Sequence, residues 1–478
     1  MKKMMIALLA CAVGLSMTAA VAMANPNVDI NLNGASAEFT LWTAAASTWL
    51  SAPAPDGGQC GPGPFPSQTC GNYYIVSAPS CGLNGGGPIT LRVSSTNSLD
   101  GINSALGQGV DPNNGSTGLA CSLNTRAAVA TTANCNLACE NIDLGASDVG
   151  GEAFGQATHG NYVGPAAGAC PACVAGAVCG ACNPNVNWKD ITASAITIPG
   201  NTDVYNPVVV PFGFYLHTDI QAKTCSAGSG TSASNAGFMA GQLCTANADC
   251  GSGAWQGTCN SGNVPGLSRQ QIVAIFSGQV NFWSDLGPEY SANGPTNTGD
   301  ISICMRHAGS GTLATLHRGI MYNSVWGGNL PTTQVWPGNP NAGTPETWFN
   351  NGTGDMMNCV SMRPGAIGYA DADRLSTNPV ANVYGPITYN GFGPSRVNIR
   401  NGNYDEFWSA QHIYQSQAEA NYLASHPIVQ HLMNWVSTPT NIPPSKAAFW
   451  ATQSEMAFQK TTDTSYPSLQ GASNQQFP

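Results

Sequence analysis

The sequence predicts an α/β fold with two domains, and three observations lead to that prediction. The chain has 478 residues, and a chain of this length forms two domains more often than one. Strand-like and helix-like stretches alternate along it, as in α/β folds. A strand, a turn of small residues and a helix follow one another at least three times. No repeat of roughly 20–50 residues is visible, which argues against a solenoid or a propeller.

The elements of the first half follow from the spacing of apolar residues. Phe39, Trp42 and Trp49 recur near helical spacing, which predicts a helix over 39–50. A second helix is expected over 99–106. A continuous apolar run is typical of a strand that is buried on both faces. The expected strands are 28–32, 89–93, 142–146 and the continuous apolar run 208–215.

The second half repeats the same alternation. Ser268 is a suitable N-cap residue, because its hydroxyl can accept a hydrogen bond from a free amide at a helix start. The expected strands are 301–305 and 366–369, and the expected helices are 268–277, a helix after 312, and 427–436. The carboxylates Asp371 and Asp373 follow the second of these strands, and we expect them to face solvent.

Composition and charge limit the classes of function. The chain carries 15 Lys and Arg against 25 Asp and Glu, a net charge of −10, whereas a nucleic-acid binder needs a basic surface. We therefore expect no nucleic-acid partner. The hydrophobic share of 42% is enough for a real core.

Residues 1–24 have the pattern of a secretory signal. Lys2 and Lys3 precede an apolar run, and Ala22-Met23-Ala24 fits a small-x-small cleavage site. We expect export to the periplasm or the extracellular space. An uncleaved membrane anchor and a lipoprotein attached at Cys11 are weaker readings of the same segment.

The 17 cysteines predict disulfides. Without Cys11 their number is even, as expected for up to eight bridges in an oxidising compartment. Two CxxC pairs at 170–173 and 179–182 could hold a metal, but their separation is short for a zinc ribbon, so we favour disulfides and expect no metal. Most cysteines lie in four Gly-rich insertions, 52–88, 107–140, 163–186 and 225–262. Cys304 and Cys359 lie outside these insertions, and we expect them to pair.

The strand–turn–helix junctions predict an anion site. The turns at 34–39, 94–98 and 309–312 each precede a helix, whose first amides lack intrahelical partners and carry partial positive charge. Arg306 stands just before the third turn and offers a planar fork to an oxyanion. Ordinary helix caps explain any one of these turns equally well.

These segments resemble the class II periplasmic binding proteins, most closely the phosphate-binding component of phosphate ABC transporters. Six segments carry the resemblance, in the family's order: Gly34-Ala35-Ser36-Ala37-Glu38-Phe39, 94–102, 145–148, 275–285, 306–312 and 364–369. The resemblance implies two α/β lobes joined by two crossing strands, near 208–214 and 404–414. Lobe I would comprise 25–205 with 405–478, and lobe II 206–404.

The resemblance also implies a ligand site in the cleft between the lobes. Asp148 would accept the proton of a monohydrogen oxyanion, which separates phosphate from sulfate. The expected ligand-binding residues are Glu38, Phe39, Ser95 and Asp148 from one lobe, and Arg306, Ser310, Gly311 and Thr312 from the other. No cofactor is implied.

Two residues depart from the family pattern. Glu38 stands where the family has a hydroxyl residue, and a carboxylate would repel a dianion unless it turns outward, is protonated or meets a cation. Ala308 stands where an acidic residue usually braces the arginine. His307 next to it could make binding pH-dependent, although a loop histidine more often faces solvent.

Three functions are open to this sequence. The first is a secreted solute-binding protein for phosphate or a related small oxyanion, serving the membrane subunits of an ABC transporter. The second is an extracellular or cell-surface structural or scavenging protein that keeps the fold without transport. The third is a phosphatase-like enzyme using Ser310 and His307. We expect no enzyme, because no orienting acid is adjacent and Ser310 starts a helix.

Overall fold

The computed structural model describes most of the chain between residues 25 and 469. The described ranges are 25–55, 57–107, 125–129, 135–155, 161–162, 193–226, 240–252, 256–293, 299–321, 346–350 and 352–469. The expected signal at 1–24 and the two CxxC pairs at 170–182 lie outside them.

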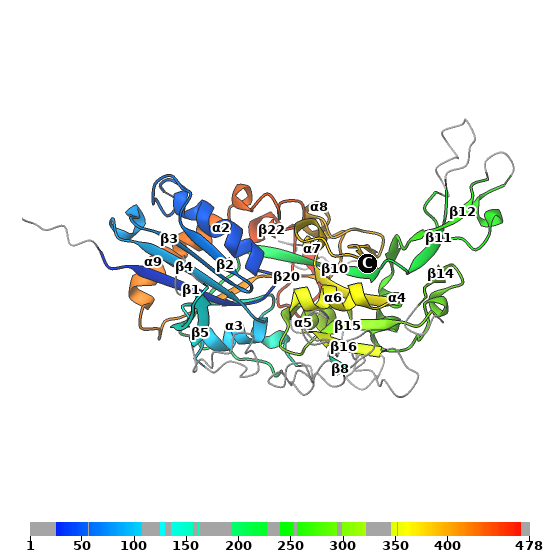
Figure 1. Ribbon diagram of the computed structural model, residues 1–478, viewed down its shortest axis with the longest axis horizontal. Helices are drawn as coiled ribbons and strands as arrows, with labels where there is room; N and C mark the ends of the chain where they lie inside the picture. The colour runs from blue at the N-terminus through cyan, green and yellow to red at the C-terminus, as the bar shows by residue number, and fades with distance from the viewer. Residues whose placement is uncertain are drawn as a thin grey trace, which may run out of the picture.

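Lobe I is built on a seven-stranded sheet (Figure 1). Its central strand, β1, pairs in parallel with β4 and β7, so the carboxyl ends of these three strands lie at one edge. The strands in spatial order are β2 (Ser67–Cys70), β3 (Tyr73–Ala78), β4 (Ile89–Ser95), β1 (Val28–Gly34), β7 (Leu144–Ser147), β21 (His412–Ser416) and β9 (Thr202–Tyr205). The expected insertion at 52–88 therefore contains two strands of the main sheet.

Lobe II is built on a second mixed sheet. Its central strand β15 pairs in parallel with β16 and β17. The strands are β18 (Val383–Tyr384), β10 (Val208–His217), β17 (Ala366–Asp371), β15 (Ser302–Arg306), β16 (Glu346–Asn350) and β8 (Asn161–Tyr162), with β20 (Trp408–Ala410) and β22 (Ala451–Thr452) attached to β10. The two residues of β8 thus join the second sheet, although they fall within the stretch expected for lobe I.

One strand, β10, belongs to both halves of the molecule. Val208, Val209 and Val210 at its start pair with the returning segments β20 and β22, whereas Phe212 to Leu216 pair with β17. Pro211 is the last residue of the first stretch and pairs with Trp408 of β20. All ten residues of β10 are buried, as its continuous apolar run predicts.

The helices cover the two sheets. In lobe I, α2 (Phe39–Ser51) and the C-terminal α9 (Tyr422–Val436) contact each other over β1, and α3 (Ser98–Ala105) packs against β1, β7 and β21. In lobe II, α6 packs against β10, β15, β16 and β17. The remaining helices are α4 (Arg269–Phe276), α5 (Gly311–Thr315) with a π-helical continuation to Ile320, α6 (Thr353–Met362), α7 (Arg374–Thr377) and α8 (Arg396–Arg400).

Small sheets complete the fold, and the longest of them forms an arm. The strands β11 (Gln221–Cys225) and β12 (Cys259–Asn263) project from lobe II and pair with each other, while β14 (Tyr290–Ser291) pairs at their base (Figure 1). Bridges Cys225–Cys250 and Cys244–Cys259 staple this arm. The other two-stranded sheets are β5 (Thr125–Val129) with β6 (Leu137–Asn141), β13 (Gly266–Leu267) with β19 (Thr388–Tyr389), and β23 (Phe458–Gln459) with β24 (Ser468–Leu469).

The disulfides support an oxidising compartment. The expected Cys304–Cys359 bridge is present, and it joins strand β15 to helix α6 rather than two strand ends. Cys60–Cys81 and Cys70–Cys135 tie the N-terminal part of lobe I. Such bridges are typical of exported proteins. Within the described part of the chain, no helix combines the length and the apolar character needed to cross a bilayer.

Asp371 and Asp373 do not face solvent, contrary to the sequence-based expectation. Both are buried at the end of β17. Asp373 accepts hydrogen bonds from the Lys446 ammonium and from the Trp450 indole, at 2.5 and 2.6 Å. The C-terminal segment supplies these two partners from a distant part of the sequence, so the local pattern at 371–373 could not reveal them.

Candidate functional site in the interlobe cleft

Three strand ends of lobe I place polar side chains at the cleft. Since β1, β4 and β7 are parallel neighbours, the turns that follow them open at the same edge. Ser36 and Glu38 follow β1, Ser98 follows β4, and Asp148 follows β7. Gly34 permits the first turn, because a Cβ there would lie 1.9 Å from the Ala146 carbonyl oxygen.

Lobe II meets these turns through the segment after β15. Ser310 is the N-cap of α5, and its hydroxyl accepts from the Leu313 amide. The Leu99 amide donates to the Gly309 carbonyl oxygen across the cleft at 3.0 Å. Gly311 lies so close to Ser98 that a Cβ would stand 2.5 Å from the Ser98 hydroxyl. The two lobes are therefore in direct contact at the expected site.

Arg306 spans the cleft from the end of β15. Its Nη1 donates to the hydroxyls of Ser36 in lobe I and Thr353 in lobe II, at 3.2 and 3.3 Å. Those two hydroxyls are 3.2 Å apart. Burial lowers the pKa of the guanidinium, which still remains a cation in the working pH range. A buried cation among hydroxyls is a suitable partner for an oxyanion.

Asp148 faces lobe II from the opposite side. Its Oδ2 accepts from the hydroxyls of Ser98 and Thr312, both at 3.3 Å, so it joins the lobes. Its Oδ1 is buried and has no hydrogen-bond partner among the described residues. Burial raises the pKa of Asp148 to about 7, against the opposing effect of Arg306. This carboxyl can therefore donate or accept a proton near neutral pH.

Glu38 is fully buried and does not turn outward. It occupies the N-cap position of α2 without capping the helix. Its Oε2 accepts from the Trp42 indole at 3.2 Å, and its Oε1 has no hydrogen-bond partner within the described structure. Burial, and then the charge of Asp148, raise the pKa of Glu38 well above its usual range. A neutral Glu38 does not repel an anion and can donate one hydrogen bond.

The segment around His307 differs from the expectation of a solvent-exposed loop. His307 is 1% exposed, and its Nδ1 accepts from the Gly309 amide at 3.1 Å. The Ser310 hydroxyl caps α5 by accepting from the Leu313 amide. Arg306 donates to the hydroxyls of Ser36 and Thr353, and Ala308, where the resemblance leads one to expect an acidic residue, brings no carboxylate to it.

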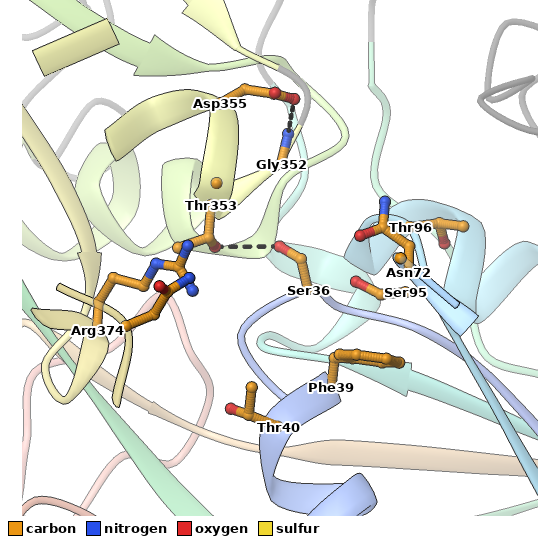
Figure 2. A pocket seen from close by; sticks show the side chains of 13 residues that line it. Ser36, Phe39, Thr40, Asn72, Ser95, Thr96, Gly352, Thr353, Asp355 and Arg374 are labelled. Atoms are coloured by element: carbon orange, nitrogen blue, oxygen red, sulfur yellow. Dashed lines mark hydrogen bonds between the residues drawn. The ribbon is translucent and has the colours of Figure 1, made fainter. Parts of the chain in front are cut away.

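A cavity of about 320 Å³ opens beside these residues. Figure 2 shows Ser36, Phe39 and Ser95 on its lobe I side, with Thr353 and Arg374 opposite. Of the expected ligand residues, Phe39 and Ser95 line this cavity. Glu38, Asp148, Arg306, Ser310, Gly311 and Thr312 are buried close by and are not part of its lining.

Sequence reasoning missed several polar residues of this region. Ser36 and Ser98 lie inside the predicted turns at 34–39 and 94–98, so the turn pattern could have indicated both. Thr353 and Arg374 follow β16 and β17, the two strands parallel to β15. The rule that parallel strands end at one edge could have indicated both.

Comparison with known proteins agrees with this architecture. Residues 243–436 match the family model described as a PBP superfamily domain. This match, together with the two sheets, confirms the resemblance to periplasmic binding proteins and the two-lobed α/β fold with Cys-rich insertions.

Several solved structures are similar to this chain. A high-affinity periplasmic phosphate-binding protein (PfluDING), solved with phosphate, is 13% identical, with a TM-score of 0.42 over 88% of this chain and 89% of that one. A phosphate-binding protein from Stenotrophomonas maltophilia is 12% identical, with a TM-score of 0.38 over 84% and 83%. A human phosphate-binding apolipoprotein is 12% identical, with a TM-score of 0.40 over 92% and 91%. We derive the ligand from the chain's own residues.

Proposed function

We propose that this protein is a solute-binding protein that holds phosphate, or a related small oxyanion, between its two lobes. One observation carries the proposal: the buried Arg306 guanidinium lies among hydroxyl groups, opposite an Asp148 carboxyl whose Oδ1 has no hydrogen-bond partner among the described residues. An ion that carries both negative charge and a proton matches this pair, because Arg306 can donate to its oxygens and Asp148 can accept its proton.

The surrounding residues support the same ligand class. The amides of Gly311 and Thr312 begin α5, so they lack intrahelical acceptors and favour an anion. Ser95 and Phe39 line the adjoining cavity. Glu38, when protonated, takes over the donor role of the hydroxyl residue found in the resembling family. The ligand residues we propose are Glu38, Phe39, Ser95, Asp148, Arg306, Ser310, Gly311 and Thr312.

The test is phosphate binding by isothermal titration calorimetry to the wild type and to Arg306→Gln. Losing one partner of a buried charged contact costs about 2–4 kcal/mol, so we expect affinity to fall roughly 30- to 1,000-fold. Arg92→Gln is the matched control, since Arg92 is a largely buried arginine of lobe I that pairs with Asp29. Equal phosphate affinity for wild type and Arg306→Gln, with both proteins folded by circular dichroism, would refute this site.

We further propose the lobe limits 25–205 with 405–478, and 206–404. The exceptions are the strands β8, β20 and β22, which join the lobe II sheet from the lobe I ranges. Delivery of the ligand to the membrane subunits of an ABC transporter, after export through a signal at 1–24, belongs to the same proposal. The stapled β11–β12 arm favours the alternative, an extracellular structural or scavenging protein without transport. Phosphate uptake by cells that lack this protein separates the two: reduced uptake supports transport, and normal uptake supports the alternative.

A further inference from the structure

The cavity beside Arg306 is larger than a single small oxyanion needs. Its volume is about 320 Å³, within the range of roughly 300–1,000 Å³ that is usual for clefts holding small organic ligands. A tetrahedral oxyanion has five heavy atoms. Arg306 lies directly behind the wall of this cavity, since Ser36 lines the cavity and also accepts a hydrogen bond from Arg306.

A second arginine, Arg374, lines the far side of this cavity. It begins α7, just after β17, and Figure 2 shows its guanidinium beside Thr353. Its Nε is buried without a hydrogen-bond partner, and the described residues give it no ion pair within 4.0 Å. Its Nη2 lies 3.8 Å from the position that a Cβ on Gly354 would take.

Thr353 stands between the two arginines. Its hydroxyl accepts from Arg306 at 3.3 Å, and its backbone starts α6 beside Arg374. The amides of Thr353 and Gly354 belong to the first turn of a ten-residue helix and have no intrahelical acceptor. Arg374 and this helix start therefore form a second positive corner within the same cavity.

The rest of the lining is mostly hydroxyl and amide groups. Phe39 is its single aromatic ring, and the polar members are Ser36, Thr40, Asn72, Ser95, Thr96 and Asn378. Asp355 is the acidic member of the wall. Its Oδ2 accepts from the Gly352 amide at 3.2 Å, and Figure 2 shows the carboxyl at the edge, turned to that amide.

We propose that the cleft takes a ligand with two oxyanionic groups joined by a short polar linkage, one group at Arg306 and the other at Arg374. Inorganic diphosphate is the smallest member of this class, and a phosphate monoester with a second acidic group is a larger one. This inference rests on the proposed function, because it places the first oxyanion at the Arg306 site.

The experiment compares diphosphate with orthophosphate by calorimetry on the full chain. We expect the wild type to bind diphosphate on the order of tenfold more tightly, as an additional charge-assisted contact should give. Arg374→Gln should lower diphosphate affinity on the order of tenfold more than orthophosphate affinity. Arg400→Gln is the control, because Arg400 is partly exposed and pairs with Glu455 away from the cavity.

Each outcome has one meaning. Orthophosphate binding that depends on Arg306, without any preference for diphosphate, overturns this inference and leaves the proposed function standing. A preference for diphosphate that survives in a folded Arg374→Gln protein also overturns it. No binding of either ion by the wild type refutes the proposed function itself. A diphosphate preference that Arg374→Gln removes and Arg400→Gln retains supports the inference.

Discussion

Lobe I and lobe II line the cleft with groups of opposite charge type. Lobe I contributes the buried carboxyls of Glu38 and Asp148, whereas lobe II contributes the guanidinium groups of Arg306 and Arg374. Arg306 donates to one hydroxyl of each lobe, and Asp148 likewise accepts from one hydroxyl of each lobe. This difference would allow a chain of net charge −10 to hold the proposed anion, because burial raises the pKa of both lobe I carboxyls and so favours their neutral forms.

The largest expected effect concerns the stability that the Cys304–Cys359 disulfide gives to lobe II. Cys304 and Cys359 are 55 residues apart in sequence, and closing a loop of that length stabilises a protein by about 4 kcal/mol. The double variant to Ser should lose this amount in denaturant unfolding. Cys60 and Cys81 of lobe I are 21 apart, so their removal should cost less, about 3 kcal/mol. A larger loss from the lobe I pair would contradict the comparison.

The next effect concerns the acceptor in lobe I. Asp148→Asn removes the carboxyl that accepts a ligand proton while keeping the shape of the side chain. A buried acceptor that faces sulfate finds no proton to accept, and this costs about 1.4–2.8 kcal/mol of binding free energy. We therefore expect the preference for phosphate over sulfate to fall roughly 10- to 100-fold. Competition calorimetry with both ions measures the ratio. An unaltered ratio would exclude Asp148 as the discriminating group.

The third effect is a pH dependence of phosphate binding that involves the buried carboxyls of lobe I. A carboxyl with a raised pKa is neutral below that pKa and becomes negative as pH rises through it, which for Asp148 is about 7. The ionised Asp148 accepts the ligand proton, so the opposing negative charge is that of Glu38, and phosphate affinity should decrease as Glu38 ionises with rising pH. Glu38→Gln removes one of the two ionising groups and should bind about tenfold more tightly than the wild type at high pH. Phosphate is ionised to the same extent in the titrations of the wild type and of Glu38→Gln at a given pH. The ratio of their two affinities therefore reports on Glu38. A ratio that is constant with pH would show that Glu38 does not ionise over the measured pH range.

The smallest effect concerns the contact between the walls. Ser36→Ala removes the lobe I hydroxyl that accepts from Arg306 and lies next to Thr353. The substitution removes a neutral hydroxyl and leaves the Arg306 charge in place, so phosphate affinity should change only two- to tenfold, about 0.5–1.5 kcal/mol. Ser51→Ala is a suitable control, since Ser51 lies at the other end of α2 and its hydroxyl bonds only within the helix. A loss as large as that of Arg306→Gln would mean that the hydroxyl, and not the charge, dominates binding.

The sequence predicted the parts of this fold that depend on local spacing. The helix at 39–50 and the strand at 208–215 are confirmed within one or two residues, because their apolar patterns are regular. Ser268 caps α4 as expected. The Cys304–Cys359 pairing is also confirmed.

The features that sequence reasoning missed depend on partners far along the chain. Asp373 is buried only because Lys446 and Trp450 reach it. Strand β3 lies in a Cys-rich stretch whose Gly and Pro content concealed the buried side chains of Tyr74 and Val76. Glu38 is an example within the site, because its raised pKa depends on burial in the folded lobe, which the local sequence does not show.

The shared strand β10 has a consequence for how the cleft moves. Its first residues are bonded to the returning segments and its later residues to the lobe II sheet, so both lobes hold the same piece of backbone. Separation of the lobes must therefore twist this strand rather than slide one surface over another. Pro211, which has no amide hydrogen to give to a neighbouring strand, stands where the pairing changes partners. We expect any opening of the cleft to be a rotation about this position, which would separate Arg306 from the lobe I turns that it contacts.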